Sequence, residues 1–184
     1  MRFAATGPKR RQALLSILLM AGGGFAQTPQ QAMAPERARA NFVAAFGSYV
    51  EWPASAFADA DAPFVIGVMG DESMLHLLEA GFQSRKLQSR QVQVRRIDTV
   101  LQASQVHLLY AAEGSNASLR ALSGTPILTI GTGTAFLDRG GIIGLIMRDE
   151  RLRFELNIKA AERSGLKVSS KLQQLAVKIY EEAR

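Results

Sequence analysis

The hydrophobic positions along the chain change period several times, which predicts a mixture of strands and helices. Short apolar or alternating runs typical of strands occur four times up to residue 130, at residues 64–69, 92–97, 107–111 and 126–130. Helical segments are expected between them, at 72–80, 99–104 and 115–122, with Asp71 and Ser115 as N-caps. This alternation indicates an α/β domain with a mostly parallel sheet flanked by helices.

The most distinctive stretch, residues 140–157, predicts a late antiparallel hairpin. Its strands are expected at 142–147 and 151–157, joined at Arg148-Asp149-Glu150. In the second strand apolar and polar residues alternate, so Arg153, Glu155 and Asn157 share one face. Two interpretations stay open: a polar network on an edge strand, or part of a ligand site.

Both ends of the domain are predicted to be helical. Residues 36–52 carry one apolar stripe, and Pro53 stops the helix, which places Glu51 and Trp52 at its exit. After one or two helical turns at 159–165, ended by a glycine, a last helix is expected from Ser169 or Ser170. Its apolar stripe comprises Leu172, Leu175, Ala176 and Ile179, with Tyr180 beside the stripe. This last helix is a possible dimer element.

The N-terminal segment changes how the charge is interpreted. Residues 1–26 combine a basic start at Lys9-Arg10-Arg11, an apolar run and small residues before a cut, the pattern of a cleaved signal peptide. The alternative is an uncleaved membrane anchor. It is disfavoured because the apolar run is shorter than the about 20 apolar residues that span a bilayer. Residues 27–35 read as a flexible leader and 36–184 as a single domain. The protein is therefore expected in the periplasm, by the secretory or the twin-arginine route.

Charge then gives no support for nucleic-acid binding. The whole chain carries +6, with 22 basic and 16 acidic residues. Four of the basic residues and none of the acidic ones lie in the signal peptide, so the mature chain carries about +2. Nucleic acid is not an expected partner.

Few residues suggest a catalytic, metal-binding or ligand-binding function. The chain has no cysteine and two histidines, which excludes thiol catalysis and disfavours a zinc site. No catalytic motif, metal site or cofactor is predicted. The candidate ligand- or partner-binding residues are those that could anchor a carboxylate or stack on a planar group, together with their neighbours: Glu51, Trp52, Arg153, Glu155 and Asn157.

Several short motifs, in order over about residues 38–180, resemble the YfiR-like family of periplasmic proteins. They are ANFVAAFGSYVEWP (40–53), FVIGVMGD (64–71), VHLLYA (106–111), PILTIG (126–131), the Gly140-Gly141 turn, RFELN (153–157) and GLKVSSKLQQLA (165–176). The resemblance implies a small α/β domain that dimerises and represses an inner-membrane diguanylate cyclase. It also implies an outer-membrane lipoprotein that relieves the repression, and control of biofilm formation through cyclic di-GMP.

One departure limits the resemblance. The family often carries a cysteine before the histidine that His107 matches, whereas this chain has Val106 there. Redox control is therefore not expected. The first hypothesis is a non-enzymatic periplasmic regulator of an inner-membrane sensor or diguanylate cyclase. The alternative is a periplasmic small-molecule binding protein with a pocket near Trp52, Arg153 and Glu155.

Overall fold

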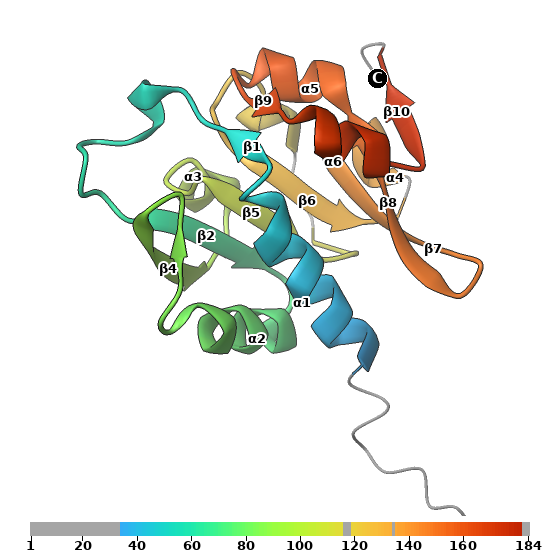
Figure 1. The fold of residues 1–184 in the computed structure, drawn as a ribbon, viewed down its shortest axis with the longest axis horizontal. Helices are drawn as coiled ribbons and strands as arrows, with labels where there is room; N and C mark the ends of the chain where they lie inside the picture. Colours follow the sequence, from blue (N-terminus) through green and yellow to red (C-terminus); the bar gives the residue numbers. More distant parts are fainter. Residues whose placement is uncertain (1–33, 116–118, 134, 182–184) are drawn as a thin grey trace, which may run out of the picture.

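An eight-stranded, mostly parallel sheet forms the centre of the protein, in a computed structural model that describes residues 34–115, 119–133 and 135–181 (Figure 1). The strand order is β10-β8-β7-β6-β5-β2-β4-β3. The strands are β2 (Phe64–Met69), β3 (Lys86–Leu87), β4 (Arg90–Arg96), β5 (Leu108–Ala111), β6 (Leu128–Thr132), β7 (Ile143–Arg148), β8 (Arg151–Asn157) and β10 (Lys178–Tyr180). The predicted fold class is confirmed. The predicted signal peptide and almost all of the leader lie outside the described residues.

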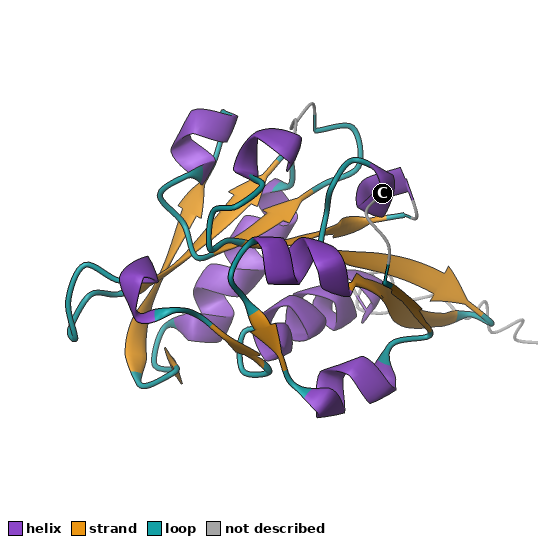
Figure 2. Ribbon diagram, turned by 90° about the horizontal axis from the view of Figure 1, so that it is seen from above, coloured by secondary structure: helices purple, strands orange, loops and turns teal. Residues whose placement is uncertain are grey.

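Helices cover both faces of the sheet (Figure 2). One face packs against α1 (Ala34–Phe46), α2 (Glu72–Phe82), α5 (Ile158–Arg163) and α6 (Ser170–Leu175). The other packs against α3 (Val100–Ala103), the 3-10 helix η2 (Leu119–Leu122) and α4 (Ala135–Asp138). Among the described helices, none has the length and apolar character needed to cross a bilayer.

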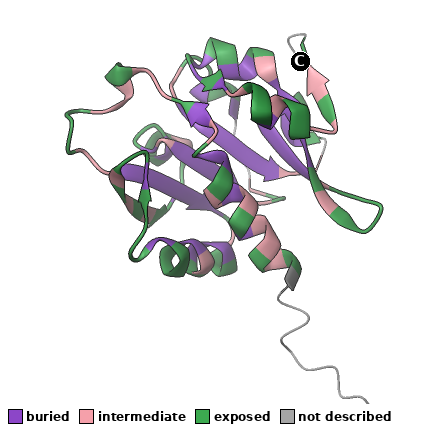
Figure 3. Ribbon diagram, viewed as in Figure 1, coloured by how far each residue is buried: buried purple, intermediate pink, exposed green. Residues whose placement is uncertain are grey.

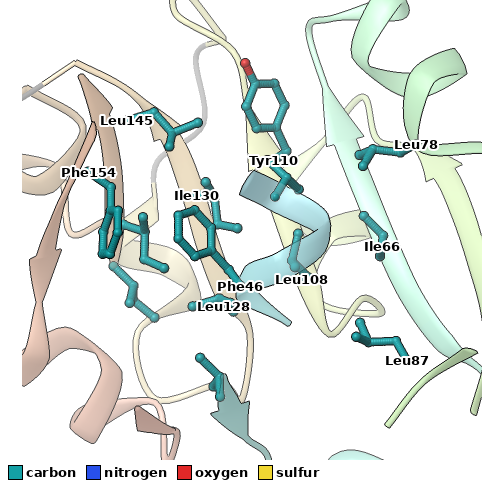
Figure 4. Packing of buried hydrophobic residues seen from close by; sticks show 14 of the residues in the cluster. Phe46, Ile66, Leu78, Leu87, Leu108, Tyr110, Leu128, Ile130, Leu145 and Phe154 are labelled. Carbon is teal, nitrogen blue, oxygen red and sulfur yellow. The ribbon is translucent and has the colours of Figure 1, made fainter. Parts of the chain in front are cut away.

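Two buried clusters hold these layers together. The first places Phe46 of α1 and Leu78 of α2 against Ile66, Leu108 and other core residues of the sheet (Figure 4). The second, on the opposite face, includes Val65 and Leu109 of the sheet with Phe136 and Leu137 of α4. Figure 3 shows the consequence: the central strands are buried, while the hairpin tip and the outer helix surfaces are exposed.

Local capping follows the sequence closely. The Asp71 carboxylate accepts a hydrogen bond from the Met74 amide at 2.9 Å, and the Ser169 hydroxyl accepts one from the Leu172 amide at 3.3 Å. Gly165 has φ +68° at the end of α5, as its predicted C-cap role requires. These caps, and the β7–β8 hairpin, are confirmed.

The first predicted helix is too long. It ends at Phe46, and Val50–Glu51 forms β1, antiparallel to β9 (Lys167–Val168). Gly47 follows the helix and admits the close approach of Leu87, because a Cβ there would lie 2.6 Å from a methyl carbon of Leu87. Trp52 therefore follows a short strand and not a helix.

The last predicted helix is also wrong in its second half. It ends at Leu175, whose side chain is 58% exposed, and Ala176 is extended. The Val177 amide then bonds to the Phe154 carbonyl, and Ile179 pairs with Leu156 in parallel register. Strand β8 is consequently not an edge strand.

Three shorter segments also differ from the prediction. Within the helix expected at 115–122, the described residues form the 3-10 helix η2 at Leu119–Leu122. The Ser115 hydroxyl, predicted to cap this helix, donates to the Ala112 carbonyl. Strand β3 and helix α4 were not predicted, because each has four residues or fewer, which is too short to show a period.

Candidate functional site

A groove of about 870 Å³ lies at the carboxyl ends of β6 and β7. It lies between the start of α1 and the β7–β8 hairpin, which extend beyond the sheet on either side of the end of β6 (Figure 1). Its wall is mostly apolar and includes Pro35, Ala38, Leu145, Ile146, Met147 and Leu152. In α/β proteins ligands and partners commonly bind outside the carboxyl ends of parallel strands, so this groove is the candidate site.

Met147 is the main exposed apolar group of the groove. Its side chain is 63% exposed, on a strand whose first three residues are buried. Methionine is flexible and polarisable, which suits it to contacts with an adaptable partner. An exposed methionine beside an apolar wall indicates a contact surface.

The hairpin tip beside Met147 has a strained backbone. Asp149 and Glu150 have φ +50° and +57°, although neither is glycine. A two-residue hairpin turn of this type requires positive φ at both positions and usually carries Asn-Gly. Keeping two acidic residues in this conformation costs stability, and such strain clusters at functional sites.

Charges of both signs border the groove. Arg39 comes from α1, Glu113 follows β5, and Glu150 belongs to the hairpin tip. Nearby, burial and then the Asp71 carboxylate raise the pKa of Tyr110, while Arg39 opposes the shift. The phenol therefore stays neutral, and the Arg39 guanidinium provides the positive charge on this side of the groove.

Trp52 lies at the other end of the sheet. Its indole Nε1 donates to the His107 carbonyl at 3.2 Å, and its ring packs edge-on against Phe64 at 4.9 Å. His107 in turn stacks on Phe57 at 4.4 Å, and the Arg90 guanidinium lies 3.9 Å from the centre of the Phe57 ring. These contacts fix the loop between β1 and β2 onto the sheet.

Two polar residues of β8, Glu155 and Asn157, have structural roles. Glu155 is buried and accepts a hydrogen bond from the Tyr180 hydroxyl at 2.9 Å, which ties β10 to β8. Asn157 is fully buried and caps α5, because its Oδ1 accepts from the Ala160 amide at 2.9 Å. Arg153 is exposed.

The five predicted site residues are therefore dispersed. Trp52 packs against the first buried cluster, which also contains Phe154 of β8. Successive residues of a strand point to opposite faces of the sheet, so Glu155 lies on the face away from Trp52. Glu51 is exposed and pairs in register with Lys167. Within the described part of the chain, none of these five residues lines the groove.

Tyr180→Phe tests the link between β10 and β8. We expect the free energy of unfolding to fall by about 1–3 kcal/mol, because the buried Glu155 carboxylate loses its phenolic donor. Urea unfolding measures the change. Combining Tyr180→Phe with Glu155→Leu should recover part of the loss, whereas strictly additive losses would contradict the coupling.

His107 makes stability depend on pH. Its Nδ1 accepts from the Val65 amide at 2.9 Å, so Nε2 carries the proton and donates to the Ala56 carbonyl at 3.0 Å. Burial is the main cause that lowers the pKa of His107 below 6.5, and Arg90 adds to it. The unfolded chain therefore binds the proton more readily, and this contribution to stability is lost as the pH falls below about 6.5.

We expect acidification from pH 7.5 to 5 to destabilise the wild type more than His107→Gln, measured as urea midpoints. Glutamine leaves every other titratable group in place. Equal losses in the two proteins would show that His107 does not carry the effect.

The groove was missed from the sequence because its residues come from separate elements. Arg39, Glu113 and Leu152 are more than 35 residues apart along the chain, and no local pattern joins them. One signal was available: Met147 ends an apolar strand directly before a charged turn.

Comparison with known proteins places the chain in a family. The model of the YfiR/HmsC-like family matches residues 36–177, most of the chain and nearly all of the folded part. The protein belongs to the YfiR/HmsC-like family, a family of regulatory, non-catalytic proteins whose members act with a diguanylate cyclase. No curated protein matches the sequence.

Similar solved structures are remote. A conserved domain protein from Vibrio cholerae shares 14% identity over 64% of this chain and 55% of its own, with a TM-score of 0.45. The ABC domain in complex with L-Trp from Streptococcus pneumonia shares 10% identity over 63% and 55%, also with a TM-score of 0.45. This chain thus spans about half the length of each.

Proposed function

We propose that this protein is a periplasmic repressor that binds the periplasmic part of an inner-membrane diguanylate cyclase and lowers cyclic di-GMP output. Family membership supports the regulatory role and the kind of partner. The observation that carries the proposal is the apolar groove with its exposed Met147. A homodimer and an outer-membrane lipoprotein that relieves repression are parts of the same proposal.

The groove defines the chemistry of the segment that it would bind. Its wall offers apolar contacts from α1, β7 and β8, and its border offers one positive and two negative side chains. An amphipathic helix of the cyclase, with apolar residues on one face and charges of both signs beside them, fits these features. Hydrophobic contacts would supply affinity, and the charges would fix orientation.

The groove also suits a regulator that acts by holding a segment of its partner in a fixed orientation. Both of its walls, α1 and the hairpin, are anchored in the first buried cluster through Phe46 and Phe154. Its surface is therefore preorganised, which lowers the ordering cost of binding. The bound segment would be held in one orientation relative to the sheet.

Met147→Glu tests the groove as the contact surface. A charge at this position should weaken binding at least about tenfold, because an unpaired carboxylate would be buried against apolar groups. In a deletion strain, wild-type protein should restore low cyclic di-GMP and the Met147→Glu variant should not. Leu101→Glu, the same kind of change on α3 at a residue 81% exposed, is the matched control and should repress normally.

Two results would count against the proposal in different ways. An unchanged cyclic di-GMP level after gene deletion would contradict the repressor role. Normal repression by a folded Met147→Glu variant, present in the periplasm at wild-type level, would place the contact surface elsewhere.

A further inference from the structure

A second cavity, here called the arginine cavity, lies at the opposite end of the sheet from the groove. It has a volume of about 320 Å³, is open to solvent on one side and is lined by residues of η2, α5 and the amino ends of β6 and β7. Five polar side chains reach its wall: Arg120, Ser123, Thr129, Arg163 and Ser164. None of its residues lines the groove, so it is a separate feature.

The arginine cavity takes its positive charge from two arginines that are exposed to solvent. Arg120 and Arg163 contribute two guanidinium groups, and no acidic side chain lines the wall. Neither guanidinium forms an ion pair with an acidic residue in the described part of the chain. Arginine forks match the geometry of carboxylate and phosphate groups.

The interior of the cavity offers hydroxyl donors. Thr129 and Ser164 are only 4% and 7% exposed, yet both line the cavity. The Thr129 hydroxyl oxygen accepts from the Ile142 amide at 3.0 Å, so its own proton is free to donate into the cavity. Apolar wall residues, including Leu122 and Ile142, surround these donors.

The end of α5 borders the arginine cavity. Its last carbonyl groups are occupied within the chain, because the Ser164, Gly165 and Leu166 amides donate to the carbonyls of Ala160, Glu162 and Ala161. On the opposite wall the Arg120 stem lies over Gly140, where a Cβ would come within 3.6 Å of Cγ.

We propose that the arginine cavity binds a small organic oxyanion, a compact molecule with a carboxylate or phosphate group and a few carbon atoms. The guanidiniums would hold the anionic group, the buried hydroxyls would donate to it, and the apolar wall would cover the carbon atoms. The volume lies at the low end for ligand pockets, which restricts the ligand to a small metabolite.

Thermal unfolding of the full mature chain with and without ligand tests this assignment. The probes are inorganic phosphate, glycerol 3-phosphate and succinate, each compared with sodium chloride at equal ionic strength. A bound ligand raises the Tm in a saturable manner. We expect Arg120→Gln/Arg163→Gln to lose this rise, and Arg163→Lys to keep part of it, since lysine retains the charge without the fork.

The control variant is Arg37→Gln/Arg95→Gln, which removes two exposed arginine charges outside the arginine cavity. A saturable rise in Tm that survives in this control and disappears in the cavity variant supports the proposal. A response to phosphate compounds alone assigns a phosphate ligand, and a response to succinate alone assigns a carboxylate. Equal responses in both double variants, or no response to any of the three probes, overturn the proposal.

Discussion

Phe154→Ala is expected to lower the free energy of unfolding by about 3–5 kcal/mol. Phe154 is 3% exposed, and its ring packs edge-to-face against Phe46 at 4.9 Å and against Phe42 at 6.4 Å. Alanine would leave a cavity between the hairpin and α1 and remove the aromatic contacts that join them. Urea unfolding at neutral pH measures the loss.

The adjacent residue provides the control. Arg153 is exposed on the same strand, so Arg153→Ala should change stability by less than about 0.5 kcal/mol. A similar loss in both variants would show that strand β8 responds to any truncation, and that the Phe154 ring is not specifically responsible.

Gly131→Ala is expected to destabilise the protein by about 1–3 kcal/mol, even though it adds only one methyl group. A Cβ at Gly131 would lie 2.3 Å from the Phe136 ring, which is 1% exposed and is also held against Gly141. The ring has no space to move, so α4 would have to shift away from β6. Thermal or urea unfolding measures the effect.

Two further variants separate this steric cause from glycine's general properties. Gly81→Ala, in α2 with no atom near the added Cβ, should instead stabilise the protein by about 0.5–1 kcal/mol. Gly131→Ala combined with Phe136→Leu should lose less stability than the sum of the two single changes. Simple additivity would argue against direct contact as the cause.

The sequence predicted the parts of the fold in which local pattern and tertiary packing agree. The apolar run at β2 corresponds to its observed bounds, and the Asp71 and Ser169 caps form because each serves the helix that directly follows it. The hairpin was also predicted, because the alternation in β8 and the apolar run of β7 are both typical of strands, although Phe154–Asn157 are buried on both faces of β8.

The errors at both ends have a common physical origin. Val50 and Ile179 fit a helical stripe, yet each pairs with a strand more than twenty residues away in sequence, Val168 and Leu156 respectively. Such apolar residues fit either a helix or a strand, and the long-range partner decides which of the two forms. The same limit applies to the predicted site, because no local sequence pattern shows whether Glu155 lies near Trp52. In the structure Glu155 is bonded to Tyr180, and Trp52 is bonded to His107.

The position of β10 has a consequence for how the protein is made. Strand β8 pairs with β7 on one side and with β10 on the other, although β10 comprises residues 178–180, close to the end of the chain. The sheet is therefore incomplete until residues 178–180 have been synthesised and have paired with β8. A chain ending before residue 178 would expose an open β8 edge and the Glu155 carboxylate without its phenol donor, which makes truncated copies prone to association through that edge.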